Sequence, residues 1–164
     1  MTAIENAVVK RTIVVPVSEE RVFDFFANHM IEWWPREFTF SEDAIAGISM
    51  EPYAGGRWYE RDSNGYETTW GTVLEWEAGS RIVLTWRISP QRTPELDDAR
   101  ASEIEVVISP QDESNTQLDL EHGKFERHGD GADMLYAGMD SAEGWTKILD
   151  RFASLVVDES EQKF

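Results

Sequence analysis

Residues 66–76, Tyr-Glu-Thr-Thr-Trp-Gly-Thr-Val-Leu-Glu-Trp, alternate between a largely aromatic set of side chains and a largely small or charged set. Successive side chains of a β-strand point to opposite faces, so residues two apart share one face. The aromatic set is Tyr66, Thr68, Trp70, Thr72, Leu74 and Trp76. The pattern predicts a strand of an antiparallel sheet whose aromatic face is covered and whose other face meets water.

Six further segments are rich in β-branched or aromatic residues, and turn signals such as Asn64-Gly65 and Ala78-Gly79-Ser80 separate them. Together with residues 66–76, the predicted strands are 8–15, 44–50, 57–61, 81–88, 103–109 and 116–122. The acidic residues of the later strands fall opposite the apolar faces, and they are Glu67, Glu75, Glu103, Glu105, Asp119 and Glu121. We therefore expect one outer sheet face that is charged and hydrated.

Two short helices are predicted between the first and second strands. Ser18 is a favourable N-cap, and Glu19 and Glu20 follow it at the positive end of the helix dipole. A second short helix is expected over residues 29–34, where Pro35 stops it.

A long amphipathic helix is predicted near the C-terminus, because residues 141–156 carry apolar side chains at spacings of three and four. Residues 140–143, Asp-Ser-Ala-Glu, resemble a capping box, so the helix is expected to begin near Ser141, after a shorter helical turn at 132–138. Gly144 costs about 1 kcal/mol inside a helix. The expected compensation is a close approach of the helix to the sheet.

The composition of the chain excludes several classes of protein. The chain has 164 residues, 15 basic and 32 acidic side chains, a formal net charge of −17 and no cysteine. No repeat or linker divides it, so we expect one domain over residues 1–164 with a core at about 7–157. The lack of basic clusters argues against a nucleic-acid partner, and the lack of cysteine excludes disulfides and thiolate metal sites. No apolar run approaches the roughly 20 residues of a membrane span, so we expect a soluble, cytoplasmic protein.

The predicted order is strand, two short helices, six strands and a long helix. This is the order of an α+β helix-grip fold, a curved antiparallel sheet of six or seven strands around the C-terminal helix. Four segments resemble the SRPBCC or START-like (Bet v 1-like) superfamily, in particular its branch related to the activator of the 90-kDa heat-shock protein ATPase. They are Gly71–Glu77, Arg81–Trp86, Thr116–Phe125 and Gly144–Phe152. The resemblance implies a cavity between sheet and helix that accepts an apolar or aromatic small molecule.

Aromatic side chains are the main candidates for ligand contacts. The chain holds seven Trp, four Tyr and eight Phe, and flat rings with a few N–H or O–H groups can line a pocket for an aromatic ligand. Core packing is the alternative explanation for each ring. Strand alternation, helix periodicity and the implied cavity together select eight candidate ligand-binding residues: Trp33, Trp58, Tyr66, Trp70, Trp86, His122, Phe125 and Trp145.

The three histidines are the polar candidates. His122 shares its strand face with two leucines, so its imidazole should point inward, either to orient a ligand or transfer a proton, or as a buried, hydrogen-bonded histidine. His29 would lie near one lip of the implied cavity, and a surface position is its simpler explanation. His128 is close to Asp130 and Asp133 but lacks metal-ligand spacing, so we expect no metal site.

No serine elbow, phosphate-binding loop or inward-facing carboxylate pair is apparent, and no cofactor is expected. Binding of a hydrophobic or aromatic small molecule without turnover is therefore the leading hypothesis. One alternative is a chaperone-associated module like the ATPase activator. The other is a lyase-, cyclase- or hydrolase-type enzyme that acts on the ligand with His122 or His29 as acid or base. A homodimer and a chaperone contact stay open as partner interactions.

Overall fold

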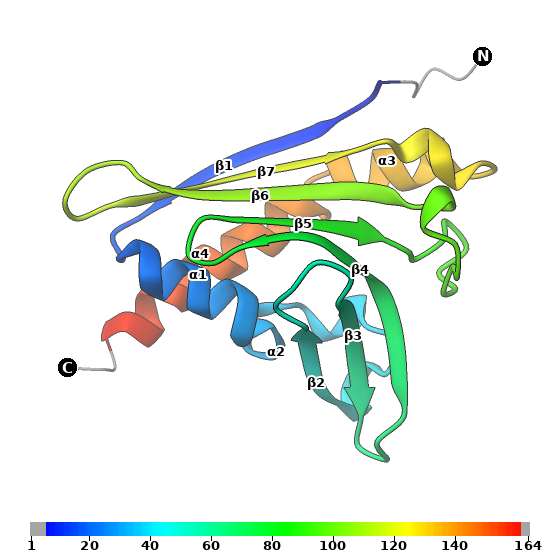
Figure 1. Cartoon of the computed structure of the whole chain (residues 1–164), viewed down its shortest axis with the longest axis horizontal. Coiled ribbons are helices and arrows are strands. Elements are labelled where there is room, and N and C mark those ends of the chain that lie inside the picture. The colour runs from blue at the N-terminus through cyan, green and yellow to red at the C-terminus, as the bar shows by residue number, and fades with distance from the viewer. Residues whose placement is uncertain (1–5, 162–164) are drawn as a thin grey trace.

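The computed structural model describes residues 6–161 (Figure 1). The ends of the expected domain, residues 1–5 and 162–164, lie outside the described residues. The strands of the sheet are β1 (Val9–Val15), β2 (Ile45–Met50), β3 (Arg57–Asp62), β4 (Glu67–Glu77), β5 (Arg81–Trp86), β6 (Ser102–Pro110) and β7 (Thr116–Gly123). The helices are α1 (Glu19–Asn28), α2 (Met30–Trp33), α3 (Ala132–Asp140) and α4 (Trp145–Glu161). Short 3-10 turns occur at η1 (Arg36–Phe38), η2 (Glu42–Ala44), η3 (Asp98–Arg100) and η4 (Phe125–His128).

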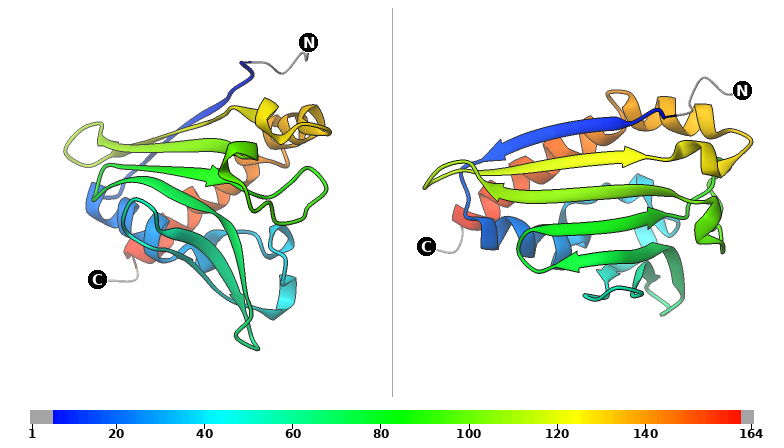
Figure 2. Two further views of the ribbon diagram at one scale, coloured as in Figure 1. Left: turned by 45° about the vertical axis from the view of Figure 1, so that its right-hand side comes forward. Right: turned by 45° about the horizontal axis from the view of Figure 1, so that its top comes forward.

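The strands form one antiparallel sheet in the order β1-β7-β6-β5-β4-β3-β2. From β2 to β7, strands that follow one another in the sequence are neighbours in the sheet. β1 pairs with β7 and forms the other edge. The sheet curls so that one face encloses α4, which contacts β1, α1, α2 and α3 (Figures 1 and 2). The predicted α+β helix-grip architecture is thereby confirmed.

The alternation predicted for residues 66–76 is interrupted in β4. This strand has one extra residue at Trp70 opposite β3 and another at Leu74 opposite β5. Each extra residue reverses the faces of the side chains that follow it. The inward positions are therefore Trp70, Val73 and Trp76, and Thr72 turns outward, where its hydroxyl donates to Asp98. The prediction that every second residue faces inward is wrong for Thr72 and for Leu74, which is the extra residue opposite β5 and does not join the core.

The helix boundaries near the N-terminus agree with the sequence, and the C-terminal one does not. Ser18 caps α1 by accepting a hydrogen bond from the Arg21 backbone N–H, as predicted. The C-terminal helix begins at Trp145 instead of Ser141. Gly144 precedes it, and a Cβ there would lie 2.4 Å from the Gly138 carbonyl oxygen. The glycine therefore permits a close approach between the start of α4 and the end of α3; the expected approach to the sheet is wrong.

The core lies between the curved sheet and the helices. Its largest fully buried side chains are dominated by Trp33, Trp34, Trp58, Trp70, Trp145, Phe125 and Phe152. Their indole and phenyl rings bury large apolar areas, which is the main favourable term in the folding of such a domain. Across residues 6–161, no helix combines the length and the apolar character needed to cross a membrane.

Replacing Gly71 by Ala should lower the free energy of unfolding by roughly 1–3 kcal/mol, the usual cost of overpacking. A Cβ at Gly71 would lie 1.8 Å from the Thr85 carbonyl oxygen, so β4 and β5 would have to separate. Gly138→Ala is the matched control, since a Cβ there meets nothing within 4 Å. Urea denaturation followed by tryptophan fluorescence measures both. Equal stability of the two variants would contradict the close packing of β4 on β5.

Candidate functional site

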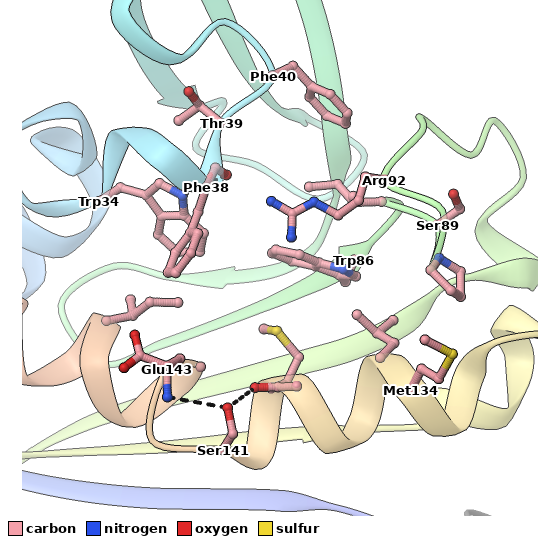
Figure 3. A pocket seen from close by; sticks show the side chains of 17 residues that line it. Trp34, Phe38, Thr39, Phe40, Trp86, Ser89, Arg92, Met134, Ser141 and Glu143 are labelled. Carbon is pink, nitrogen blue, oxygen red and sulfur yellow. Dashed lines mark hydrogen bonds between the residues drawn. The ribbon is translucent and has the colours of Figure 1, made fainter.

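A pocket of about 380 Å³ lies at one end of the molecule, where β5 ends and where α3 meets α4 (Figure 3). Its volume falls within the range of small-molecule sites. The aromatic part of its wall consists of Trp34, Phe38, Phe40 and Trp86, and the aliphatic part includes Ile88, Leu135, Met139 and Ile148. Met134, 75% exposed, lies at the rim. The lining is therefore largely apolar and open to solvent on the side of α3.

Trp34 reaches this wall because it precedes Pro35. A residue before proline is driven out of the helical conformation, and Trp34 is extended, with ψ 130°, at the end of α2. Its indole N–H then donates to the Phe38 carbonyl at 3.2 Å. Trp33, one residue earlier and still helical, turns the other way and donates to the Phe25 carbonyl in the core. Of these two adjacent tryptophans, Trp34 therefore lines the pocket and Trp33 packs in the core.

The wall behind the pocket is a cluster of indoles. The Trp34 ring centroid lies 5.2 Å from that of Trp70, 5.9 Å from Trp145, and 6.2 Å from each of Trp58 and Trp86. Tilted and edge-on contacts at these separations are favourable for aromatic rings. Because β3, β4, β5, α4 and the segment after α2 each contribute a ring, the aromatic face of the pocket is fixed by the fold's main elements.

The eight predicted ligand-binding residues divide into three groups. Trp86 is the one member of the set that lines the pocket, within the part of the chain that the structure describes. Six are packed inside the core, and these are Trp33, Trp58, Trp70, His122, Phe125 and Trp145. Tyr66 lies in the turn before β4 and is 72% exposed, so its predicted inward position is wrong. The role of these residues in ligand binding stays a prediction.

Several pocket residues were not found by strand alternation. Trp34, Phe38 and Phe40 belong to an irregular segment, and Leu135 and Met139 lie on α3. The sequence signal for Trp34 was the proline that follows it. The segment of Phe38 and Phe40 carries no periodic pattern that would assign its rings to a pocket.

Glu60 is a buried carboxylate that the sequence pattern also missed. It is 0% exposed on β3. One of its oxygens accepts from the Phe40 backbone N–H at 2.8 Å and from the Trp70 indole N–H at 2.7 Å. The other accepts from the backbone N–H and the hydroxyl of Ser41. A buried carboxylate needs such donors to offset its desolvation, and here they fasten the segment carrying Phe40 to the sheet.

A second buried polar feature is a hydrogen-bonded network that links β7, β6, η4 and α4. The Trp145 indole N–H donates to His122 Nδ1 at 2.9 Å, and His122 Nε2 lies 2.7 Å from Ser102 Oγ. Ser102 Oγ lies 2.8 Å from His128 Nε2. An indole nitrogen only donates, so His122 carries its proton on Nε2 and donates it to Ser102, whose hydroxyl and backbone N–H both donate to His128 Nε2. Both imidazoles are neutral in this arrangement.

Burial disfavours protonation of both histidines. His122 is 0% exposed, and burial, with a smaller contribution from His128, holds its pKa well below the usual value. Burial also lowers the pKa of His128 from 6.5 to about 4, against an opposing effect of Glu95 and with a further lowering by Arg100. Within the described residues, His122 is thus a buried histidine bonded to side chains and does not line the pocket.

The other polar candidates do not assemble into a reactive site. His29 is on the surface, where it pairs with Asp24 and Glu32. The described residues contain no group of three or more His, Cys, Asp or Glu side chains placed to hold a metal ion. The outer sheet face carries ion pairs such as Arg81 with Glu75 and Glu105.

Glu60→Gln should lower the free energy of unfolding by roughly 1.5–3 kcal/mol, because the amide N–H₂ would face donors in place of an acceptor. Glu67→Gln is the matched control. Its carboxylate forms an exposed ion pair with Arg57, and such pairs contribute roughly 0–1 kcal/mol. Chemical denaturation compares the two variants with the wild type. If Glu60→Gln were no more destabilising than Glu67→Gln, the anchoring role of Glu60 would be refuted.

The stability of the fold should decrease as the pH falls from 6.5 towards 4, because the unfolded chain protonates His128 in this window and the folded chain does not. One such group contributes a slope of up to about 1.4 kcal/mol per pH unit. His128→Gln should reduce the slope measured by urea denaturation at pH 7, 6 and 5. Ser102→Ala should lower stability but keep the slope, since it removes no titrating group. An unchanged slope in His128→Gln would show that His128 titrates alike in both states.

The comparisons with known proteins agree with this structure. The structure of Txn09, described as an anthrahydroquino-gamma-pyrone synthase, is similar with 38% sequence identity and a TM-score of 0.65, covering 93% of this chain and 99% of that chain. The self-sacrificing resistance protein CalC from Micromonospora echinospora is 26% identical, with a TM-score of 0.65 over 94% of this chain and 97% of that one.

Protein NE0264 from Nitrosomonas europaea is 18% identical, with a TM-score of 0.63 over 97% of this chain and 98% of that chain, and shows likeness of fold alone. No curated protein matches the chain. The family model described as "Activator of Hsp90 ATPase homolog 1-like protein" matches residues 16–157. The chain therefore belongs to the Activator of Hsp90 ATPase homolog 1-like family, within the SRPBCC superfamily.

Proposed function

We propose that this protein binds a flat aromatic small molecule in the pocket beside α3. The observation that carries the proposal is the pocket itself, about 380 Å³ in volume and walled by the rings of Trp34, Phe38, Phe40 and Trp86. Ring faces and edges at such a wall favour contact with another aromatic ring over contact with water. Small-molecule sites have this composition, an apolar lining with few polar groups.

The likeness to Txn09 supports an aromatic ligand in particular. That protein is described as a synthase of an anthrahydroquinone-type pyrone, a fused aromatic compound, and the match covers nearly all of both chains. The pocket volume lies towards the small end of the usual range of 300–1,000 Å³. A compact ligand of a few fused rings therefore suits it better than a long-chain lipid.

An enzyme that closes a ring on its bound ligand is the second candidate function, favoured by the 38% identity to a protein described as a synthase. Among the described side chains, those of residues 6–158, the charged groups that line the pocket are Arg92 and Glu143. They can polarise or deprotonate a ligand hydroxyl, but they do not form a hydrogen-bonded acid and base pair. We therefore place binding first. Conversion of the ligand to a product with a different chromatographic retention and absorption spectrum after incubation with the protein would favour the enzyme.

A contact with a chaperone ATPase, the third alternative, rests on the family description alone. The pocket geometry does not bear on it. Stimulation of a chaperone ATPase by this protein would support it independently of ligand binding.

Binding of 2-(hydroxymethyl)anthraquinone, a neutral three-ring probe, should quench tryptophan fluorescence, because Trp34 and Trp86 line the pocket. Gly138→Leu should weaken binding at least tenfold while the protein stays folded, since Gly138 lines the pocket and a side chain there has open space. Ser154→Leu, at an exposed position of α4, adds the same side chain elsewhere and should bind like the wild type. Absence of binding by the wild type, or equal binding by Gly138→Leu, would overturn the proposal.

A further inference from the structure

One cation extends into the pocket from the turn after β5. Arg92 lines the pocket, and Figure 3 shows its guanidinium reaching across towards Phe38, above the ring of Trp86. The surrounding wall is aromatic. A guanidinium in this position is close to any ligand that stacks on these rings.

The backbone at Arg92 is in a conformation that does not favour arginine. Its φ is 65°, in the left-handed region where glycine or asparagine is preferred. The turn holds this geometry through a hydrogen bond from the Arg92 N–H to the Ser89 carbonyl and one from the Ser89 N–H to the Thr93 carbonyl, both 2.8 Å long. A residue kept in an unfavourable conformation at the edge of a pocket points to a role for its side chain.

The Arg92 guanidinium has no hydrogen-bond or ion-pair partner among the described side chains of residues 6–158, although the chain contains 32 acidic residues. The acidic residue of the pocket, Glu143, pairs instead with Lys147 at 3.3 Å. The hydroxyls of Ser89 and Ser141 are also engaged, with Thr93 and with the Gly138 carbonyl. The cation is therefore available to a ligand.

A second donor of the pocket wall lacks an acceptor. The indole nitrogen of Trp86 is buried and makes no hydrogen bond within the described part of the chain. A buried donor without a partner is unfavourable, and native structures contain few of them. Arg92, by contrast, is exposed, so its guanidinium is the donor of this wall that a ligand can reach.

We propose that Arg92 recognises a carboxylate on the aromatic ligand, so that the preferred ligands of this pocket are aromatic acids. The inference rests on the proposed function. The planar fork of arginine matches the two oxygens of a carboxylate. The aromatic wall provides the affinity for the rings, and Arg92 selects the charged member of a pair of otherwise equal ligands.

The test compares anthracene-2-carboxylate with its methyl ester, two probes with the same rings and different charge. The wild type should bind the carboxylate at least tenfold more tightly than the ester, as followed by the anisotropy of anthracene fluorescence. Arg92→Met should remove that preference by weakening the carboxylate about tenfold or more, as expected for loss of a charged hydrogen bond. It should leave the affinity for the ester within twofold. Arg92→Lys should retain part of the preference.

Arg61→Met is the matched control, because Arg61 is an exposed arginine on β3 outside the pocket and its loss changes the net charge equally. It should bind both probes like the wild type. Arg92→Gly should melt no lower than the wild type, since glycine suits the positive φ, yet it should lose the carboxylate preference. This combination separates ligand recognition from a structural role of the side chain.

Equal binding of both probes by the wild type, or an equal loss in Arg61→Met, would overturn the role of Arg92 and leave the pocket proposal standing. If neither anthracene probe nor the neutral anthraquinone bound to the wild type, the proposed function itself would fail, and this inference with it.

Discussion

The bend of β4 is the constraint on which the core and the pocket both depend. An ideal strand through this part of the sheet would face Thr72 and Leu74 inward, and the sheet would stay flatter. The two extra residues, Trp70 and Leu74, bend and twist β4. The inward positions then fall to Trp70, Val73 and Trp76, and the sheet can enclose α4. Gly71 allows the neighbouring strand to approach closely at the same place.

Two buried polar groups connect the layers that this curvature brings together. Glu60 joins β3 to Trp70 and to the segment around Phe40, and His122 joins β7 to α4 through Trp145. Apolar contacts persist when side chains shift slightly, whereas each of these polar groups accepts its hydrogen bonds in one arrangement. They therefore hold the indole cluster in register with the sheet. Neither lines the pocket, so their effect on it is to position the rings.

The sequence predicted the fold far better than the site. Alternation in β5, β6 and β7 and the spacing of Trp145, Ile148 and Phe152 depend on burial of one face, and burial leaves a periodic trace. The pocket depends on features that periodicity does not reveal. Trp34 leaves its helix because a proline follows, Glu60 is buried in a strand where a carboxylate is unexpected, and Phe40 belongs to an irregular segment. Such features are set by tertiary contacts, which one sequence does not reveal.

The pocket has walls of unequal stiffness. Its aromatic side consists of Trp86 on β5 and Trp34, Phe38 and Phe40 in the segment after α2, and the two indoles are packed on further indoles of the core. On the other side lies α3, whose buried side chain among its described residues is Ala132, and whose Met134 is largely in water. Leu135, Tyr136 and Met139 of α3 are half-buried against the core, so displacing α3 disturbs fewer fully buried contacts than displacing an indole. The proposed ligand should therefore tolerate substituents better on the side of α3 than on the flat face against the indoles. One scaffold can then accept a series of related aromatic compounds without any change in its core.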